Sequence, residues 1–431
     1  MIILLYIMMF FGGIHQLEYH DLNVFNNLYR YYLEGGYNMV NNARTVSPKD
    51  FGAVGNGIAD DTKAFKNMFA SGAKRFYITQ GTYMINQELK VPTGSYIYGE
   101  DIDNTILKNG TKQPVYAATL NFLNCSNATI YNLTLDGNID NVPGDINQGV
   151  LNMRIQNATN IIVRNVRFAN NKYLGCNLVN SKNVTYDSCY FDNIDSGING
   201  TNGTTTDGVT ITNCVFDGHD YSEPIALLNA KNIYVTNCTM KNKIYGHAMA
   251  FLGCQNVQVK NCSIYNCTKT FYLTSSKNVR NQGITIADCT FEACESGEIA
   301  NSDNVKISNC TFQDSIITID NSKNVEFSDS KFIAKSLPCM IAFAGSISRD
   351  IKFTSNTIDN TSGLNYGNSF LSVYNVIISN ITFKSNKFIN AILYNRSFVP
   401  GSSIIFSCNY DQNGKLYTVY KPYVKNVNYG C

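Results

Sequence analysis

The sequence predicts an all-β protein: a single-stranded right-handed parallel β-helix of about a dozen coils, with an N-terminal capping helix. Two observations lead to this prediction. A short motif recurs down most of the chain, and within each copy apolar residues alternate with polar ones. Alternation with a period of two is the signature of a strand with one buried face. Units too short to bury that face alone must stack on their neighbours, and the stack supplies the core.

The recurring motif reads Asn-Val-x-Val-x-Asn-Cys-x-Phe, and most copies follow one another by about 24 residues. Parallel strands in register rise by about 4.8 Å per coil, so equivalent residues of successive coils lie over one another. The first Asn of the motif should therefore form a column whose side-chain amides hydrogen-bond along the axis. The members of this column are Asn183, Asn232, Asn256, Asn304 and Asn324.

A helix is expected where the stack begins. Asp60, Asp61 and Thr62 are residue types that cap a helix N-terminus, and they precede an apolar face at helical spacing. That face contains Ala64, Phe65, Met68 and Phe69. We expect this helix to close the open end of the core.

The same segment carries a family resemblance. The run Asp50-Phe-Gly-Ala-Val-Gly-Asn-Gly57, followed by Asp60-Asp-Thr62, resembles the opening of pectate-lyase-superfamily, or pectin-lyase-like, β-helix proteins. With the preceding Arg44-Thr-Val46, it is most similar to the openings of phage tailspikes and virion appendages. The resemblance implies a β-helix that binds polysaccharide and that, as in the tailspikes, assembles as a homotrimer.

Composition limits the partners and the domain plan. Charged residues are only 15% of the chain and the net charge is +2, so electrostatics give no reason to expect nucleic acid. The apolar run Met1–Phe11 is about half the length of a membrane span. We divide the chain into an N-terminal apolar or helical segment that serves as attachment, signal or cap (1–45), the β-helix (46–395) and a C-terminal cap (396–431).

The 14 cysteines are expected to be mostly reduced thiols that act as small buried hydrophobes. Six occupy the same inward position of the repeat: Cys189, Cys214, Cys238, Cys262, Cys289 and Cys310. Disulfides among Cys254, Cys267 and Cys294 are the alternative. No Cys/His cluster has zinc spacing, so neither a metal nor another cofactor is expected. Reduced thiols fit assembly in a bacterial cytoplasm.

Four carboxylates fall on two adjacent coils and form the candidate site. Asp192 and Asp217 lie three residues after their column cysteines, and Asp195 and Asp220 lie six after. Stacked like charges separate their pKa values, as an acid/base pair requires. We therefore predict Asp195 and Asp220 as the acid/base pair, with Asp192 and Asp217 tuning them. Carboxylates chosen only for corner turns are the alternative interpretation.

Three further residues of the same coils are predicted to bind substrate: His219, Glu223 and His247. A second, weaker candidate cluster contains Asp136, Asp140 and Asp145. The series Asn193-Ile-Asp195, Asp217, Asp220 and Gly246-His247 is similar to the Asn-x-Asp, Asp-Asp and Gly-His-Gly series of polygalacturonase-like glycoside hydrolases. The adjacent Asp-Asp pair is absent, Ala248 replaces the last Gly, and Arg280 matches the family's Arg-x-Lys only loosely.

Three functions remain open from the sequence. The leading one is a phage tailspike or virion appendage that binds host surface polysaccharide, with its cleavage by a glycosidase or lyase reaction left open. The second is a non-catalytic structural or adhesive virion protein, and the third is a secreted cellular polysaccharide lyase or hydrolase. The first two place the protein in the virion and the third outside the cell.

Overall fold

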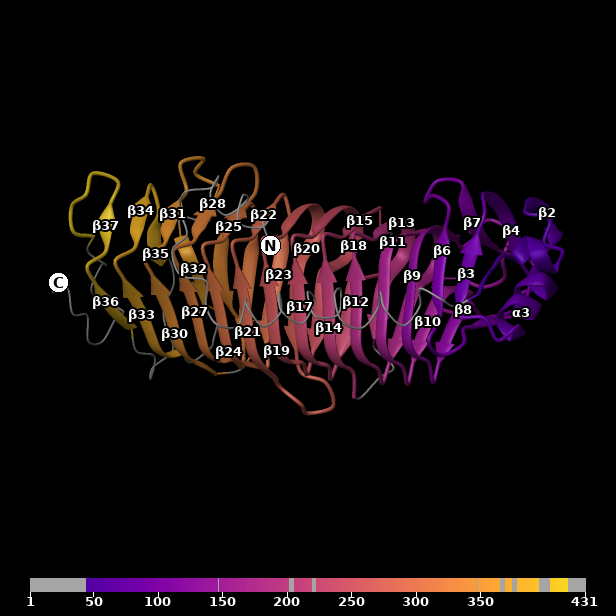
Figure 1. The fold of residues 1–431 in the computed structure, drawn as a ribbon. Helices are drawn as coiled ribbons and strands as arrows, with labels where there is room; N and C mark the ends of the chain where they lie inside the picture. The colour runs from indigo at the N-terminus through magenta and orange to yellow at the C-terminus, as the bar shows by residue number, and fades with distance from the viewer. Residues whose placement is uncertain are drawn as a thin grey trace, which may run out of the picture.

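The chain winds into a right-handed parallel β-helix of about 14 turns, which confirms the predicted fold class. The computed structural model describes residues 44–417, apart from 146, 201–204, 219–221, 346, 365–368, 374–377 and 395–403. The predicted N-terminal segment therefore lies almost wholly outside the described residues. Figure 1 shows an elongated stack of coils with α3 (Thr62–Ala70) at the indigo end and β37 near the other.

Each full coil contributes one strand to each of three parallel ladders. The first ladder contains β1 (Thr45–Val46), β3 (Arg75–Ile78), β6 (Tyr96–Gly99), β9 (Ser126–Asp136), β11 (Thr159–Val179), β12 (Lys182–Asp187), β14 (Asp207–Thr212), β17 (Lys231–Thr236), β19 (Gln255–Lys260), β21 (Asn281–Ala287), β24 (Ser302–Ser308), β27 (Lys323–Ser328), β30 (Ser348–Thr354), β33 (Ile378–Lys384) and β36 (Ile404–Ser407).

The second ladder follows the first in each coil. It contains β2 (Asn56–Asp60), β4 (Gly81–Ile85), β7 (Thr105–Asn109), the later parts of β9 and β11, β13 (Tyr190–Gly200), β15 (Val215–Asp217), β18 (Thr239–Leu252), β20 (Ser263–Thr274), β22 (Thr290–Glu292), β25 (Thr311–Gln313), β28 (Lys331–Ile333), β31 (Thr357–Asp359), β34 (Lys387–Ile389) and β37 (Tyr410–Asp411).

The third ladder completes the coil. It contains β5 (Leu89–Lys90), β8 (Ala118–Leu123), β10 (Leu151–Gln156), the last parts of β11, β13, β18 and β20, and also β16 (Ile225–Leu228), β23 (Ser296–Ala300), β26 (Ile316–Asp320), β29 (Met340–Phe343), β32 (Ser369–Val373) and β35 (Ile392–Tyr394).

The core is a set of side-chain columns inside the coils. Phe191 of the second ladder stacks between Phe168 and Phe216, with both pairs of ring centroids 4.6 Å apart and nearly parallel planes. Each of these rings is fully buried. Because the strand period puts every second residue inside, in-register stacking turns the motif's Phe into an aromatic column on these three coils, which Met240 and Ile264 continue as aliphatic residues on the next two.

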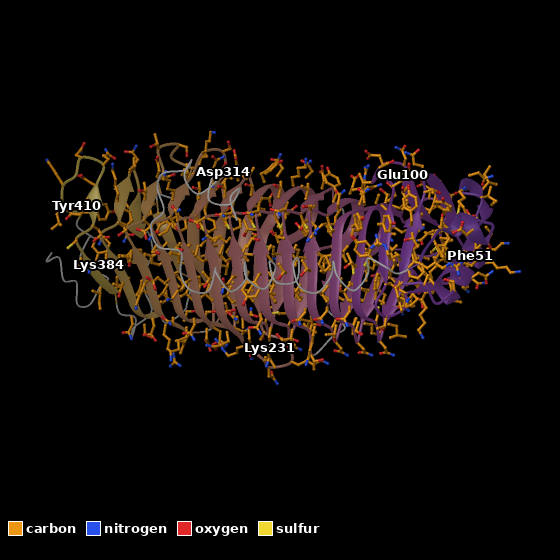
Figure 2. The ribbon with its side chains drawn as sticks, in the orientation of Figure 1. Phe51, Glu100, Lys231, Asp314, Lys384 and Tyr410 are labelled. Carbon is orange, nitrogen blue, oxygen red and sulfur yellow. The ribbon has the colours of Figure 1, made fainter. Side chains whose placement is uncertain are left out.

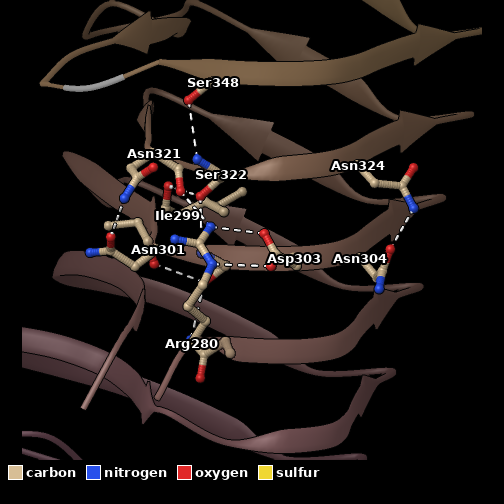
Figure 3. A network of polar contacts seen from close by, with 12 residues as sticks. Arg280, Ile299, Asn301, Asp303, Asn304, Asn321, Ser322, Asn324 and Ser348 are labelled. Carbon is tan, nitrogen blue, oxygen red and sulfur yellow. Dashed lines mark hydrogen bonds and ion pairs between the residues drawn. The ribbon is translucent and has the colours of Figure 1, made fainter. Parts of the chain in front are cut away.

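The predicted Asn column lies at a corner where the backbone is left-handed, but Gly208 and Gly283 interrupt it on the coils between Asn183 and Asn232 and between Asn256 and Asn304. Asn256 Nδ2 donates to Asn232 Oδ1 at 2.6 Å, and Asn324 Nδ2 donates to Asn304 Oδ1 at 2.7 Å, as Figure 3 shows for the second pair. All four residues have a φ between 53° and 58°. Asn tolerates this region better than most residues, so the motif's Asn both turns the corner and links the coils.

The turn from the first ladder to the second, here called the cysteine corner, holds the six motif cysteines. All described cysteines except Cys408 are free and buried, including the three for which a disulfide was the alternative. Cys408 is disulfide-bonded, which corrects the expectation for this one residue. Each thiol donates to a backbone carbonyl of the preceding coil, as Cys189 Sγ does to Val163 O at 3.4 Å. Burial raises the pKa of the Cys254 thiol to about 12, so it stays protonated.

A short 3-10 helix, η2 (Pro48–Phe51), precedes α3 at the start of the stack, and α3 buries the predicted apolar face against the first coils. Its capping differs from the expectation. Asp61 occupies the N-cap position, but its carboxylate accepts from Val54 N and Gly55 N at 2.6 and 3.0 Å instead of capping the helix. Asp60 Oδ1 accepts from Thr62 N at 3.0 Å and supplies the cap. The motif's second aspartate therefore fixes the glycine-rich turn before the helix.

Candidate functional site

The turn from the second ladder to the third is where the repeat loses its regular register, and we call it the bulged corner. The register shifts between Asn171 and Leu174, between Lys243 and His247, and between Lys269 and Tyr272. The second and third shifts share β20, and the first lies earlier in the stack, between β11 and β13. Bulges re-aim side chains that a regular ladder would point straight out, and they recur beside active sites.

Three of the predicted site residues lie at this corner on successive coils, and two of them, Glu223 and His247, are in contact. Asp195 lies just before the third-ladder part of β13 and is 6% exposed. On the next coil, Glu223 precedes β16, and Ser196 Oγ donates to its backbone carbonyl at 2.9 Å. On the coil after that, His247 Nδ1 lies 3.7 Å from Glu223 Oε1. The side chains of Glu223 and His247 are 25% and 11% exposed, so the pair remains reachable from solvent.

An aromatic residue holds the His247 ring. The Tyr272 ring of β20 stacks on the imidazole with centroids 4.6 Å apart and planes 13° apart. His247 thus has a carboxylate on one side and a ring face on the other. Such a stack fixes the orientation of the imidazole.

Asp195 lies near a second tyrosine. Burial raises the pKa of Tyr173, and the adjoining Tyr116 and the negative charge of Asp195 raise it further. The ring of Tyr173 contacts that of Tyr116 with centroids 6.1 Å apart. Asp195 therefore lies between a tyrosine of the preceding coil and the Glu223–His247 pair that follows.

The predicted Asp192–Asp217 stack is present, but both carboxylates are neutralised by neighbouring cations. The two residues are register partners on β13 and β15. Asp192 pairs with Arg167. Asp217 pairs with Lys241 Nζ at 3.1 Å and accepts from Asn242 Nδ2 at 2.8 Å. Partial burial would raise the pKa of Asp217, but these two partners together hold it below its usual value.

The remaining candidates are not brought together with this group by the described structure. His219 and Asp220 lie outside the described residues. In the weaker cluster, Asp136 pairs with Lys108 at 3.8 Å, and Asp145 Oδ1 accepts backbone N–H groups of its own turn. Arg280 forms two hydrogen bonds with Asp303, at 3.0 and 2.8 Å, and a third with the Asn321 carbonyl (Figure 3).

Sequence reasoning missed Tyr272, Tyr173 and Ser196 as members of the site. The signal for Tyr272 was in the alternation of β20, where Phe271 and Leu273 point inward and Tyr272 points out. Tyr173 and Ser196 could not be identified in this way, because counting residues from the column cysteine fails wherever a bulge shifts the register. Within the described ranges, no group of three or more His, Cys, Asp or Glu side chains has the geometry of a metal site. No described helix is long and apolar enough to cross a membrane.

Comparison with known proteins identifies relatives of this architecture. A family model described as "Rhamnogalacturonase A/epimerase, pectate lyase-like" matches residues 44–298. The pre-neck appendage protein of Bacillus phage B103 is 31% identical over 133 residues, which are 29% of this chain and 15% of that protein. Mannuronan C5-epimerase AlgE1 of Azotobacter vinelandii is 29% identical over 124 residues, 25% of this chain and 9% of that protein. The matches thus span only a small part of these relatives.

A solved structure supports the fold over most of the chain. The family 28 exopolygalacturonase of Yersinia enterocolitica aligns with a TM-score of 0.56 and 14% identity, covering 79% of this chain and 78% of that one. At this identity the likeness concerns the fold alone.

Proposed function

The chain belongs to the rhamnogalacturonase A/epimerase, pectate lyase-like family, and from that premise we propose that it binds polysaccharide and cleaves it at the bulged corner. The observation that carries the proposal is the placement of Asp195 and of the Glu223–His247 pair at one corner of three successive coils. A cluster of titratable groups at a point where the regular repeat breaks is a candidate site with a physical rationale.

The chemistry fits the cleavage of a glycosidic bond. That reaction needs one carboxyl group to protonate the leaving oxygen and a second to activate water or attack the sugar carbon. Asp195, nearly buried, serves as the acid in this proposal. Glu223, oriented by His247, serves as the second carboxylate, while the predicted partner Asp220 stays a prediction because it lies outside the described residues.

The other predicted carboxylates receive a supporting role. Asp192 and Asp217 are held by Arg167 and Lys241, and a carboxylate already paired with a cation is a poor proton donor. They fix the end of the second ladder beneath the site. His247 positions Glu223, and Tyr272 offers a ring edge beside it where a sugar could pack.

We also propose that the protein works as part of a phage appendage and assembles as a homotrimer. The similarity to pre-neck appendage proteins of Bacillus phages supports virion association. Light scattering tests the assembly: a trimer predicts three times the chain mass of 48.0 kDa, and a monomer contradicts it.

A non-catalytic adhesive protein is the second candidate. The pairing of Asp192, Asp217 and Asp136 with cations favours it, because carboxylates locked in ion pairs serve the fold rather than chemistry. A secreted cellular enzyme, the third function expected from the sequence, would differ from both virion candidates because it would act without virion proteins.

The test is a reducing-end assay on polygalacturonate, alginate and purified Bacillus cell-wall polysaccharide. The relatives' names suggest these polymers. Asp195→Asn and Glu223→Gln should each lower turnover by about a hundredfold, the usual scale for losing an acid or base. Asp192→Asn is the matched control and should change turnover less than about threefold. Equal losses in all three variants would contradict the site, and no turnover by the parent would favour the adhesive protein.

A further inference from the structure

Four tyrosines and one arginine gather on the outer face of the first ladder, away from the bulged corner. Arg75 and Tyr77 lie on β3, Tyr96 and Tyr98 on β6, and Tyr131 on β9. Their strands are register neighbours, with Arg75 opposite Tyr96, and Tyr77, Tyr98 and Tyr131 in line. We call this group the tyrosine platform.

The rings of the platform form one continuous surface. Tyr98 lies at its centre, with ring centroids 5.1 Å from Tyr77, 5.7 Å from Tyr96 and 5.5 Å from Tyr131. The planes of Tyr98 and Tyr131 are 10° apart. The Arg75 guanidinium lies over two rings, 5.2 Å from the Tyr96 centroid and 5.7 Å from that of Tyr98. All five side chains are partly exposed.

The core does not account for this cluster. The inward residues of the same strands, among them Phe76, Ile97 and Ile130, are fully buried and supply the hydrophobic contacts. Farther along the outer face, the position of Tyr96 is taken by Thr185 on β12 and Thr210 on β14. Side chains without rings therefore suffice on the coils that follow, and the contiguous group of aromatic rings is confined to three coils, with Tyr234 on β17 lying apart from it.

Charge is distributed unevenly across the platform. No carboxylate in the described ranges forms an ion pair with Arg75, whose guanidinium lies against ring faces and keeps its positive charge. At the opposite edge lies Glu100, labelled in Figure 2, and burial followed by the nearby Glu100 carboxylate raises the pKa of the Tyr77 hydroxyl. A ligand that covers both edges would meet a cation at one end and a hydrogen-bond acceptor at the other.

We propose that the tyrosine platform is a second carbohydrate site, which takes an acidic oligosaccharide lying across the first ladder. The apolar faces of the sugar rings pack on Tyr98 and Tyr131, a sugar carboxylate pairs with Arg75, and hydroxyl groups bond to tyrosine hydroxyls and Glu100. Flat aromatic surfaces with polar rims suit such ligands, because the rings bury the C–H face while their hydroxyls satisfy polar groups. A charge-assisted bond to a guanidinium adds selectivity for the acid.

Binding can be separated from any cleavage by using full-length Asp195→Asn protein throughout. The probes are hexagalacturonate and the neutral maltohexaose, with affinities measured by calorimetry. The chain contains 28 Tyr and no Trp, so intrinsic fluorescence gives an independent report from tyrosine alone. In this background, Tyr98→Ala should weaken hexagalacturonate binding about five- to tenfold, as expected for one lost ring contact.

Two further variants sharpen the test. Tyr234→Ala is the matched control, because Tyr234 occupies the outer row of Tyr96 on β17, beyond the platform. It should leave the affinity unchanged. Arg75→Gln should weaken hexagalacturonate binding about tenfold while changing maltohexaose binding less than twofold, because only the acid pairs with the cation.

Three results would overturn the proposal. One is binding by Tyr98→Ala equal to that by Tyr234→Ala, and another is no binding of either probe by the parent protein. The third is a change in the oligomeric state of Tyr98→Ala in solution without a change of affinity for the probes. That result would assign the platform to contact with a second copy of the chain. Tyr98→Phe, which keeps the ring, should retain most of the affinity and so excludes misfolding as the cause.

Discussion

The cysteine corner and the bulged corner turn the same chain within the same coils, yet they differ in regularity. At the cysteine corner one residue type recurs from Cys189 to Cys310, each thiol buried and bonded to a carbonyl. At the bulged corner the register shifts three times, and the equivalent places hold Ser196, Glu223 and His247. The comparison teaches that regular corners stabilise the stack, while the irregular corner carries the chemistry.

If the regular parts of the coils stabilise the stack, the largest loss of stability should come from a substitution in the regular core. Phe191→Ala removes the middle ring of the Phe168–Phe191–Phe216 stack and leaves a cavity. We expect the free energy of unfolding to fall by about 3–5 kcal/mol. Urea unfolding followed by circular dichroism measures this, with Glu223→Gln at the bulged corner as the control that should change the midpoint little. A larger loss in the control would break the comparison.

The Asn column predicts a smaller and more specific effect. Asn256 has a φ of 53° and donates to Asn232, so Asn256→Ala loses the hydrogen bond and also strains a left-handed backbone. Asn256→Gly loses only the bond, because glycine accepts this φ freely. We expect losses of about 2 kcal/mol for Ala and about 1 kcal/mol for Gly. Equal losses would show that backbone conformation is not what selects Asn at this corner.

The smallest effect concerns the ion pair beneath the site. The pKa of Asp217 is lowered in the folded protein, so its ionised form contributes stability above the unfolded pKa of about 4. That contribution is lost as the pH falls through the lower folded value. Asp217→Asn should therefore lower the unfolding free energy by about 0.5–1 kcal/mol at pH 7. The difference from the parent should shrink toward zero in thermal melts near pH 2, and a constant difference would contradict the assignment.

The fold was readable from the sequence because regular corners repeat their residues. The Asn and Cys columns and the apolar face of α3 each follow from local patterns that stacking multiplies. The site was only partly readable, for a physical reason. Counting from the column cysteines places Glu223 and His247 in one register, nine residues after Cys214 and Cys238, and these two side chains do meet. A bulge leaves no mark in a residue count, and Tyr173 lies within the register shift between Asn171 and Leu174.

The tyrosine platform could not be predicted from the sequence either. Arg75 and Tyr131 are 56 positions apart in the chain, and Tyr131 occupies a variable position of its copy of the motif. They meet because three coils of unequal length restore the register of the first ladder. Aromatic residues on the outer face carry no periodic signal, so only the assembled ladder reveals them.

The central claim is that glycan binds at the bulged corner, and hydrogen–deuterium exchange tests it most directly. Full-length Asp195→Asn protein is compared with and without hexamers of galacturonate and mannuronate. The account predicts slower amide exchange in residues 193–200, 222–228 and 246–252, with the cysteine corner unchanged. Protection confined to other coils at saturating hexamer would contradict the claim, even if the tyrosine platform were among the protected regions.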